Sequence, residues 1–137
     1  MPIDGIVHAK KVSREFVTKV VPSKVKATAE GVAMYALEKA VELSPILTGR
    51  FAASWRITTP NSGSGPAGKG HWDRAGAMAE AEGASLPAIS RIMYGSKFTL
   101  ENAAPYAQFV EYGSPHTEAH YITRRVAQAI GGKFGKI

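Results

Sequence analysis

The spacing of apolar residues divides the first third of the chain into two helices. Apolar side chains recur at three- and four-residue steps from Ala9 to Val21, which predicts a short amphipathic helix. Pro22 interrupts this pattern, because proline donates no backbone hydrogen bond, and Ser23 is well placed to cap a second helix. An alanine-rich apolar stripe continues from there until Ser44-Pro45 ends the second helix.

The period then changes from helical to alternating. Every second residue from Phe51 to Ile57 is apolar, which predicts a strand over 50–59 with one buried face. Asp73 is expected to cap a short alanine-rich helix that reaches about Glu82. A second alternating stretch begins at Ile89 and continues to residue 102, and a turn at Gly95 makes it a hairpin.

The last third of the chain again has helical spacing. Pro105 fits the first turn of a helix that Gly113 ends, and a final amphipathic helix follows from residue 121 until Gly131-Gly132 closes it. The aromatic residues of the first of these helices follow its period, which favours a place in the core over a binding groove; they are Tyr106, Phe109 and Tyr112.

The predicted elements specify a fold class. We expect a single α+β domain over 1–137, with helices packed on a small, mostly antiparallel sheet. Residues 60–72 are rich in glycine and proline and predict a long flexible loop, and residues 131–137 predict a mobile C-terminal tail.

The glycine-rich loop resembles a phosphate-binding loop without completing one. The stretch from Gly63 to Gly70 has Gly70 in the place where such loops carry the serine or threonine that holds magnesium. Pro66 also removes one of the amides that surround a phosphate. A mobile loop is therefore favoured over a nucleotide site, and no cofactor is expected.

Composition narrows the class of protein further. The chain has 137 residues, 45% of them hydrophobic and 20% charged, which is typical of a globular domain. It contains no cysteine, which excludes disulfides, thiolate metal sites and thiol nucleophiles. The sequence has neither the pattern of a signal peptide nor an apolar run long enough to cross a membrane, so a soluble protein made in the cytoplasm is expected.

Side chains that could support catalysis are scattered. His116 and His120 are four residues apart, but no glutamate directly follows the first histidine as in zinc proteases, and only His71 with Asp73 offers further ligands. There is no G-x-S-x-G motif, and the few carboxylates form no pair suited to acid–base chemistry. We therefore expect neither an enzyme nor a metal centre.

The net charge of +6 is concentrated near the N-terminus. A solvated helix face is the favoured interpretation, because no aromatic residues interleave the basic ones as a stacking platform for bases requires. An acidic protein or a nucleic acid remains an alternative partner. The basic residues are Lys10, Lys11, Arg14, Lys19, Lys24 and Lys26.

Two stretches of the chain, taken together, resemble a known family. Ser44–Trp55 (SPILTGRFAASW) and Asn102–Gly113 (NAAPYAQFVEYG) are similar to two segments of the head–tail connector and tail-completion (neck) proteins of tailed bacteriophages. Asp73–Ala79 resembles the opening of the short middle helix of that family. Leu47 replaces the usual aspartate, and the segment after Gly113 differs from the family pattern. The matching motif residues are Thr48, Gly49, Arg50, Trp55, Pro105, Tyr106, Glu111 and Gly113.

The resemblance implies a structural virion protein rather than an enzyme. Proteins of this family form rings, commonly hexameric, that join the tail tube to the capsid connector and let the genomic DNA pass without reading its sequence. The implied partners are other copies of the chain and neighbouring neck, connector and tail-tube proteins, and the implied place is the neck or tail of a virion assembled in the bacterial cytoplasm. A basic nucleic-acid-binding protein that uses the N-terminal helices is the alternative. The glycine-rich loop is the expected contact to a neighbour, with Lys69, His71 and Arg74 as candidate contact residues.

Overall fold

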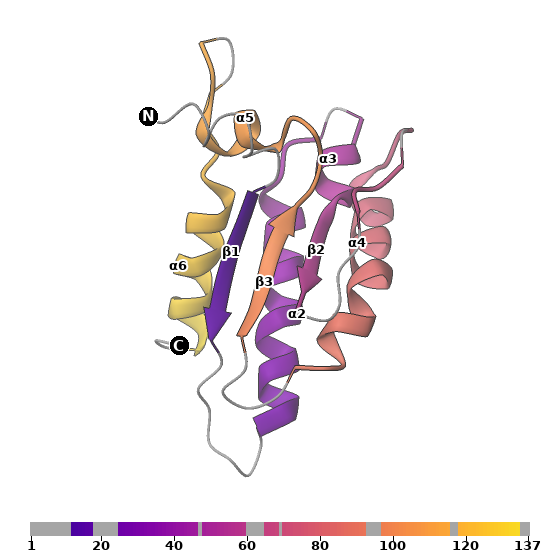
Figure 1. Cartoon of the computed structure of the whole chain (residues 1–137). Helices are drawn as coiled ribbons and strands as arrows, with labels where there is room; N and C mark the ends of the chain where they lie inside the picture. The colour runs from indigo at the N-terminus through magenta and orange to yellow at the C-terminus, as the bar shows by residue number, and fades with distance from the viewer. Residues whose placement is uncertain are drawn as a thin grey trace.

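The fold is α+β, as the sequence predicts. The computed structural model describes residues 12–17, 25–46, 48–59, 65–68, 70–92, 97–115 and 118–134 (Figure 1). Within these ranges the chain forms five helices and one antiparallel sheet of strand order β1-β3-β2. The elements are β1 (Val12–Val17), α2 (Val25–Leu43), α3 (Arg50–Ala53), β2 (Trp55–Thr58), α4 (Arg74–Ile89), β3 (Lys97–Asn102), α5 (Ala107–Tyr112) and α6 (Ile122–Phe134).

The helices α6, α2 and α4 lie along one face of the sheet, while α3 and α5 lie together at one of its ends (Figure 1). Opposed residues of antiparallel strands share a face, and the register aligns Phe16 with Phe98 and Ile57 with Leu100. All four are buried, and the two phenylalanine rings stack with centroids 5.1 Å apart. The apolar row of the sheet therefore forms one core with the helices.

Small side chains let α2 approach its neighbours closely. Ala29, Ala33, Ala36 and Ala40 have no exposed surface, and α2 packs against both α4 and α6. The helix ends at Leu43, as expected from Ser44-Pro45. Because alanine loses almost no side-chain freedom on burial, this helix can sit in the middle of the helical layer at little entropic cost.

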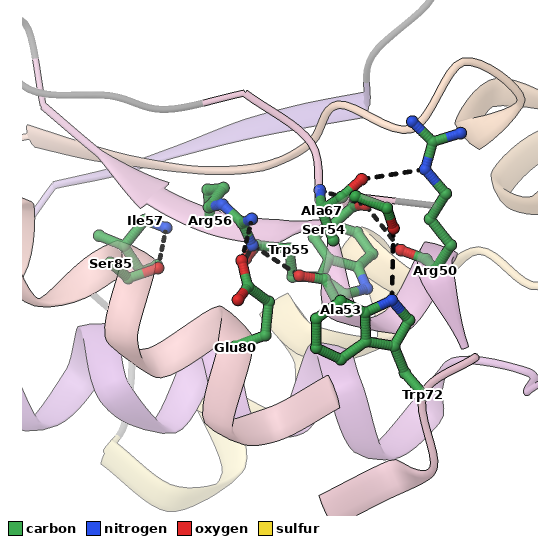
Figure 2. Close-up of polar contacts among 11 residues, drawn as sticks. Arg50, Ala53, Ser54, Trp55, Arg56, Ile57, Ala67, Trp72, Glu80 and Ser85 are labelled. Carbon is green, nitrogen blue, oxygen red and sulfur yellow. Dashed lines mark hydrogen bonds and ion pairs between the residues drawn. The ribbon is translucent and has the colours of Figure 1, made fainter. Parts of the chain in front are cut away.

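Helix α4 covers the outer edge of β2. The Ser85 hydroxyl accepts a hydrogen bond from the Ile57 amide at 2.9 Å, and Arg56 forms an ion pair with Glu80 at 2.9 Å (Figure 2). Burial of the Arg56 guanidinium lowers its pKa, and the Glu80 carboxylate opposes that shift. The Ser85 side chain of α4 thus accepts a hydrogen bond from a backbone amide that an edge strand otherwise presents to another chain.

The predicted N-terminal helix is wrong, because residues 12–17 form strand β1. Val12 and Phe16 are four residues apart, and a four-residue step returns to the same side of a helix and of a strand alike. The spacing therefore fits both structures, and pairing with β3 decides between them. The expected cap Ser23 lies outside the described residues.

The alternating patterns were also misleading in two places. Residues 50–53 form the single helical turn α3, so the strand predicted over 50–59 begins only at Trp55, and all four residues of β2 are buried. No strand starts at Ile89, because α4 runs on past Glu82 to that residue and includes Pro87. The buried residues near its end recur at helical spacing, which explains the extension; they are Ala81, Ser85, Ala88, Ile89 and Ile92. The predicted hairpin turn at Gly95 lies outside the described residues.

The ends of three helices can be compared with their sequence signals. The Asp73 carboxylate accepts a hydrogen bond from the Gly76 amide at 2.7 Å, which confirms the predicted cap of α4. Gly113 ends α5 with a φ of 82°, also as predicted. In contrast, α6 continues through Gly131 and Gly132 to Phe134, so the first residues of the expected mobile tail are helical.

Candidate interaction surface

A tight turn leads from α2 into α3 and depends on Gly49. This glycine has a φ of 82°, and a side chain at its Cβ position would overlap the carbonyl oxygen of Trp72. The Trp72 amide donates to the carbonyl oxygen of Thr48 at 2.6 Å, which holds the two segments against each other. The positive φ and the close approach of Trp72 each favour glycine at this position of the motif.

Asn102 joins the two motifs that carry the family resemblance. Its side-chain amide donates to the carbonyl oxygen of Phe51 at 2.6 Å and accepts from the Ala104 amide at 3.0 Å. The rings of Phe51 and Tyr106 lie 6.4 Å apart. Residues that are 51 positions apart in the sequence therefore meet at the end of the sheet where α3 and α5 lie (Figure 1).

Trp55 and Arg74 hold the C-terminal end of α2. The Trp55 indole donates to the Ser44 hydroxyl at 2.8 Å, and that hydroxyl donates to the carbonyl oxygen of Ala40 at 2.6 Å. The Arg74 guanidinium donates to the carbonyl oxygens of Val41, Glu42 and Ser44. Trp55 is fully buried and thus anchors β2 to the end of α2. Arg74, a candidate assembly contact, binds the end of a helix in its own chain.

Glu111 caps α6 from inside the fold. Its side chain is 1% exposed, and its carboxylate accepts from the amides of Ile122 at 2.8 Å and Thr123 at 2.9 Å. The Thr123 hydroxyl is a further donor to the same carboxylate. A buried negative charge at a helix N-terminus interacts favourably with the unpaired amides there. This glutamate therefore couples α5 to α6.

The aromatic residues of α5 lie on the surface, so their predicted place in the core is wrong. Ala107 and Glu111 take the inward positions of this six-residue helix, and the aromatic side chains project from the opposite side. Tyr121 is also exposed, and its amide donates to the carbonyl oxygen of Glu111 in α5 at 2.9 Å. We call the four residues the α5 aromatic surface; their exposed fractions are Tyr106 37%, Phe109 47%, Tyr112 62% and Tyr121 41%.

The periodicity of the sequence does not identify Tyr121 as part of this surface. It has a φ of 48°, a left-handed conformation that is uncommon for a residue other than glycine, and the Arg124 guanidinium lies 4.5 Å from the centre of its ring. Its backbone hydrogen bond to Glu111 depends on the return of the chain after α5, which no local pattern encodes.

A cavity of about 400 Å³ opens beside this surface. Most of its lining is apolar, and Arg50 is the only charged residue among the described residues that line it. The lining joins the turn before α3, α3 itself, α5 and one residue of the glycine-rich loop: Pro45, Thr48, Gly49, Arg50, Phe51, Gly70, Tyr106 and Val110. Thr48, Gly49, Arg50 and Tyr106 belong to the motifs singled out in the sequence.

The Arg50 guanidinium uses one of its three nitrogens in a hydrogen bond, and the other two have no partner among the described residues. Its Nε donates to the carbonyl oxygen of Ala67 at 3.0 Å, and the Ala67 amide donates to the Ser54 hydroxyl at 3.0 Å (Figure 2). The two terminal nitrogens of the guanidinium point away from these residues in Figure 2. Ala67 is 2% exposed, so this part of the predicted loop is packed against α3.

The other candidate contact residues and sites are only partly described. His71 is exposed, whereas Lys69, His116 and residues 60–64 lie outside the described residues. Pro105 is exposed just before α5. In the part of the chain that the structure describes, no three histidine or carboxylate side chains gather as a metal site, and no helix combines the length and apolarity of a membrane span.

Comparison of the chain with protein-family models, curated proteins and solved structures finds no match. The resemblance to phage neck proteins therefore stays a prediction from the sequence motifs.

Proposed function

We propose that this protein is a structural virion protein of a tailed phage, a tail-completion or head–tail joining subunit that assembles with other copies of itself into a ring. The observation that carries the proposal is the α5 aromatic surface, which is exposed and three of whose four residues belong to the second motif of the resemblance. We propose that its neighbours are the tail tube and the capsid connector.

The composition of this surface favours contact with protein. Tyrosine and arginine are enriched in the energetically important centres of protein interfaces, and the α5 aromatic surface combines three tyrosines, a phenylalanine and Arg124. A buried aromatic side chain removes about 150–250 Å² from water, so four that are about half exposed offer a few hundred Å². That area can form the centre of an interface of about 800 Å² per subunit.

A ring also needs a second, different surface on each subunit, because its contacts run from one face of a copy to another face of the next. The outer edge of β1 is the candidate. Among the described residues no strand pairs with that edge, and Ser13, Arg14 and Glu15 are exposed along it. The other edge of the sheet is covered by α4, which leaves β1 as the edge available for addition of a strand from a neighbour.

Sedimentation velocity over a range of concentrations tests the proposal. We expect the wild-type chain to form a concentration-dependent oligomer that appears as rings in electron micrographs, and the double variant Phe109→Ser/Tyr112→Ser to remain a monomer. Leu86→Ser is the matched control, because Leu86 is 53% exposed on α4, apart from the α5 aromatic surface. A wild-type monomer at all concentrations, or equal dissociation of the control, contradicts self-assembly through α5.

Complementation connects the oligomer to the virion. A phage that lacks this gene should regain its titre with the wild-type or Leu86→Ser chain and not with the double variant. The nucleic-acid alternative predicts instead salt-dependent affinity for duplex DNA by the isolated chain. That alternative placed the basic residues on N-terminal helices, and the first of these segments is strand β1.

A further inference from the structure

We propose that the cavity beside α5 is a receptor for a different protein, and that it takes an apolar, preferably aromatic, side chain whose carboxylate neighbour binds Arg50. The inference rests on the proposed assembly function in taking the ligand to be a protein. It adds a second contact, with a partner of defined chemistry, to the contact between copies of the chain.

The apolar half of the ligand follows from the lining of the cavity. Phe51, Val110 and the ring of Tyr106 face a space of about 400 Å³, and Gly49 and Gly70 keep backbone rather than side chains at its wall. A space of this size accommodates one large side chain together with part of its backbone. An aromatic ring gains most there, because it can pack on Phe51 and Tyr106, whose rings already lie 6.4 Å apart.

The acidic half of the ligand follows from Arg50. Its Nε is engaged with the carbonyl oxygen of Ala67, which fixes the plane of the guanidinium while its two terminal nitrogens have no partner among the described residues. A guanidinium presented in this way offers paired donors that match the two oxygens of a carboxylate. The net charge of +6 on the whole chain also attracts an acidic partner.

The ligand is not a second copy of the described surface. That surface presents four exposed aromatic residues, and only Tyr112 has a carboxylate neighbour, Glu111, which is buried and already accepts hydrogen bonds from α6. The exposed aliphatic residue Leu86 lies between Ser85 and Pro87. The described part of the chain therefore has no exposed aromatic or aliphatic anchor with a free acidic neighbour, and we take the complementary partner to be a different protein.

The cavity can be occupied while α5 contacts another copy. Tyr106 and Val110 line it, whereas Phe109 and Tyr112 are not part of its lining. Residues 106 and 110 are one turn apart on one side of the helix, and residues 109 and 112 follow on the adjoining side. The two contacts therefore use neighbouring sides of α5.

Ligand-observed NMR titration of the full chain tests the assignment, with acetyl-Phe-Asp-amide as the probe. We expect millimolar binding, and about tenfold weaker binding of acetyl-Phe-Asn-amide, which keeps the shape of the ligand and removes its charge. Arg50→Gln should reduce affinity for the aspartate dipeptide to that for the asparagine dipeptide. Val110→Phe, which adds a ring to the wall of the cavity, should abolish binding of both.

Lys97→Gln is the matched control, since it removes an exposed positive charge that does not line the cavity, and its affinity should equal that of the wild type. Equal affinity for the two dipeptides overturns the role of Arg50 even if Arg50→Gln fails to fold, because that comparison uses the wild-type chain alone. Undiminished binding to a folded Val110→Phe chain, or no binding at about 10 mM, overturns the cavity as the site. Phenylacetate binding as tightly as the aspartate dipeptide would identify a site for small carboxylates instead. None of these outcomes changes the sedimentation test of the proposed function.

Discussion

The two segments that resemble phage neck proteins use their aromatic residues in opposite ways. In the segment from Ser44 to Trp55 they are directed inward: Phe51 is 4% exposed and Trp55 has no exposed surface. In the segment from Asn102 to Gly113, Tyr106, Phe109 and Tyr112 are exposed, and the side chains that hold the segment in place are the polar Asn102 and Glu111. Aromatic residues three or four positions apart can thus be buried in one segment and exposed in another.

The surroundings of α3 and α5 explain this difference. Helix α3 follows directly on the turn at Gly49 and contacts both α2 and α4, so its apolar residues are enclosed. Helix α5 lies at the end of the sheet, where Ala107 and Glu111 are buried against the rest of the chain while Phe109 and Tyr112 are exposed. We infer that the first segment supports the fold, whereas the second also presents a surface to a partner.

Replacing Gly49 should disrupt the turn in the segment from Ser44 to Trp55 and cause the largest loss of stability. Gly49→Ala forces a side chain into a backbone with positive φ and against the carbonyl of Trp72, so we expect the free energy of unfolding to fall by about 3 kcal/mol or more. Urea denaturation followed by circular dichroism measures it. Gly68→Ala is the control and should change stability by less than about 0.5 kcal/mol, because nothing lies within 4 Å of the added carbon. A loss below about 1 kcal/mol for Gly49→Ala contradicts the described turn.

Replacing Glu111 should weaken the contact between α5 and α6 and leave the exposed aromatic side chains of α5 unchanged. Glu111→Gln removes the charge that the α6 amides and the Thr123 hydroxyl donate to, and sets an amide group against them. We expect a loss of about 2 kcal/mol in the free energy of unfolding, measured by the same denaturation. Glu118→Gln changes an exposed carboxylate just before α6 and should have almost no effect. Equal effects of the two substitutions would show that Glu111 is not the cap.

Changing the exposed aromatic residues should affect stability least. In a monomeric preparation, Phe109→Ser and Tyr112→Ser, singly, should each alter the midpoint of urea denaturation by an amount equivalent to less than about 0.5 kcal/mol, because these side chains are 47% and 62% exposed. Phe51→Ser, the same kind of change in a buried residue, should cost about 3 kcal/mol or more. A large loss from Tyr112→Ser would place this ring in the core and remove the distinction between the two segments.

Several parts of the fold follow from local signals in the sequence. The end of α2 at Ser44-Pro45, the cap of α4 by Asp73 and the end of α5 at Gly113 each depend on residues within one helical turn, and all three are confirmed. Strand β1 could not be predicted in this way, since Val12 and Phe16 fit a helix and a strand equally. The sequence does not predict the end of α4 correctly, because the apolar residues near Ile89 also fit the alternating pattern of a strand.

The features of the candidate site also fall into two groups, those that follow from the sequence and those that depend on tertiary contacts. The sequence by itself determined that Gly113 ends a helix, because a helix end favours glycine, and the resemblance singled out Gly49, Trp55 and Glu111. Only the tertiary structure decided that Phe51 and Tyr106 share a cavity, that Arg74 binds the end of α2 and that α5 exposes its aromatic side. These features depend on contacts between segments far apart in the chain, and the periodicity of one segment carries no information about what packs against it.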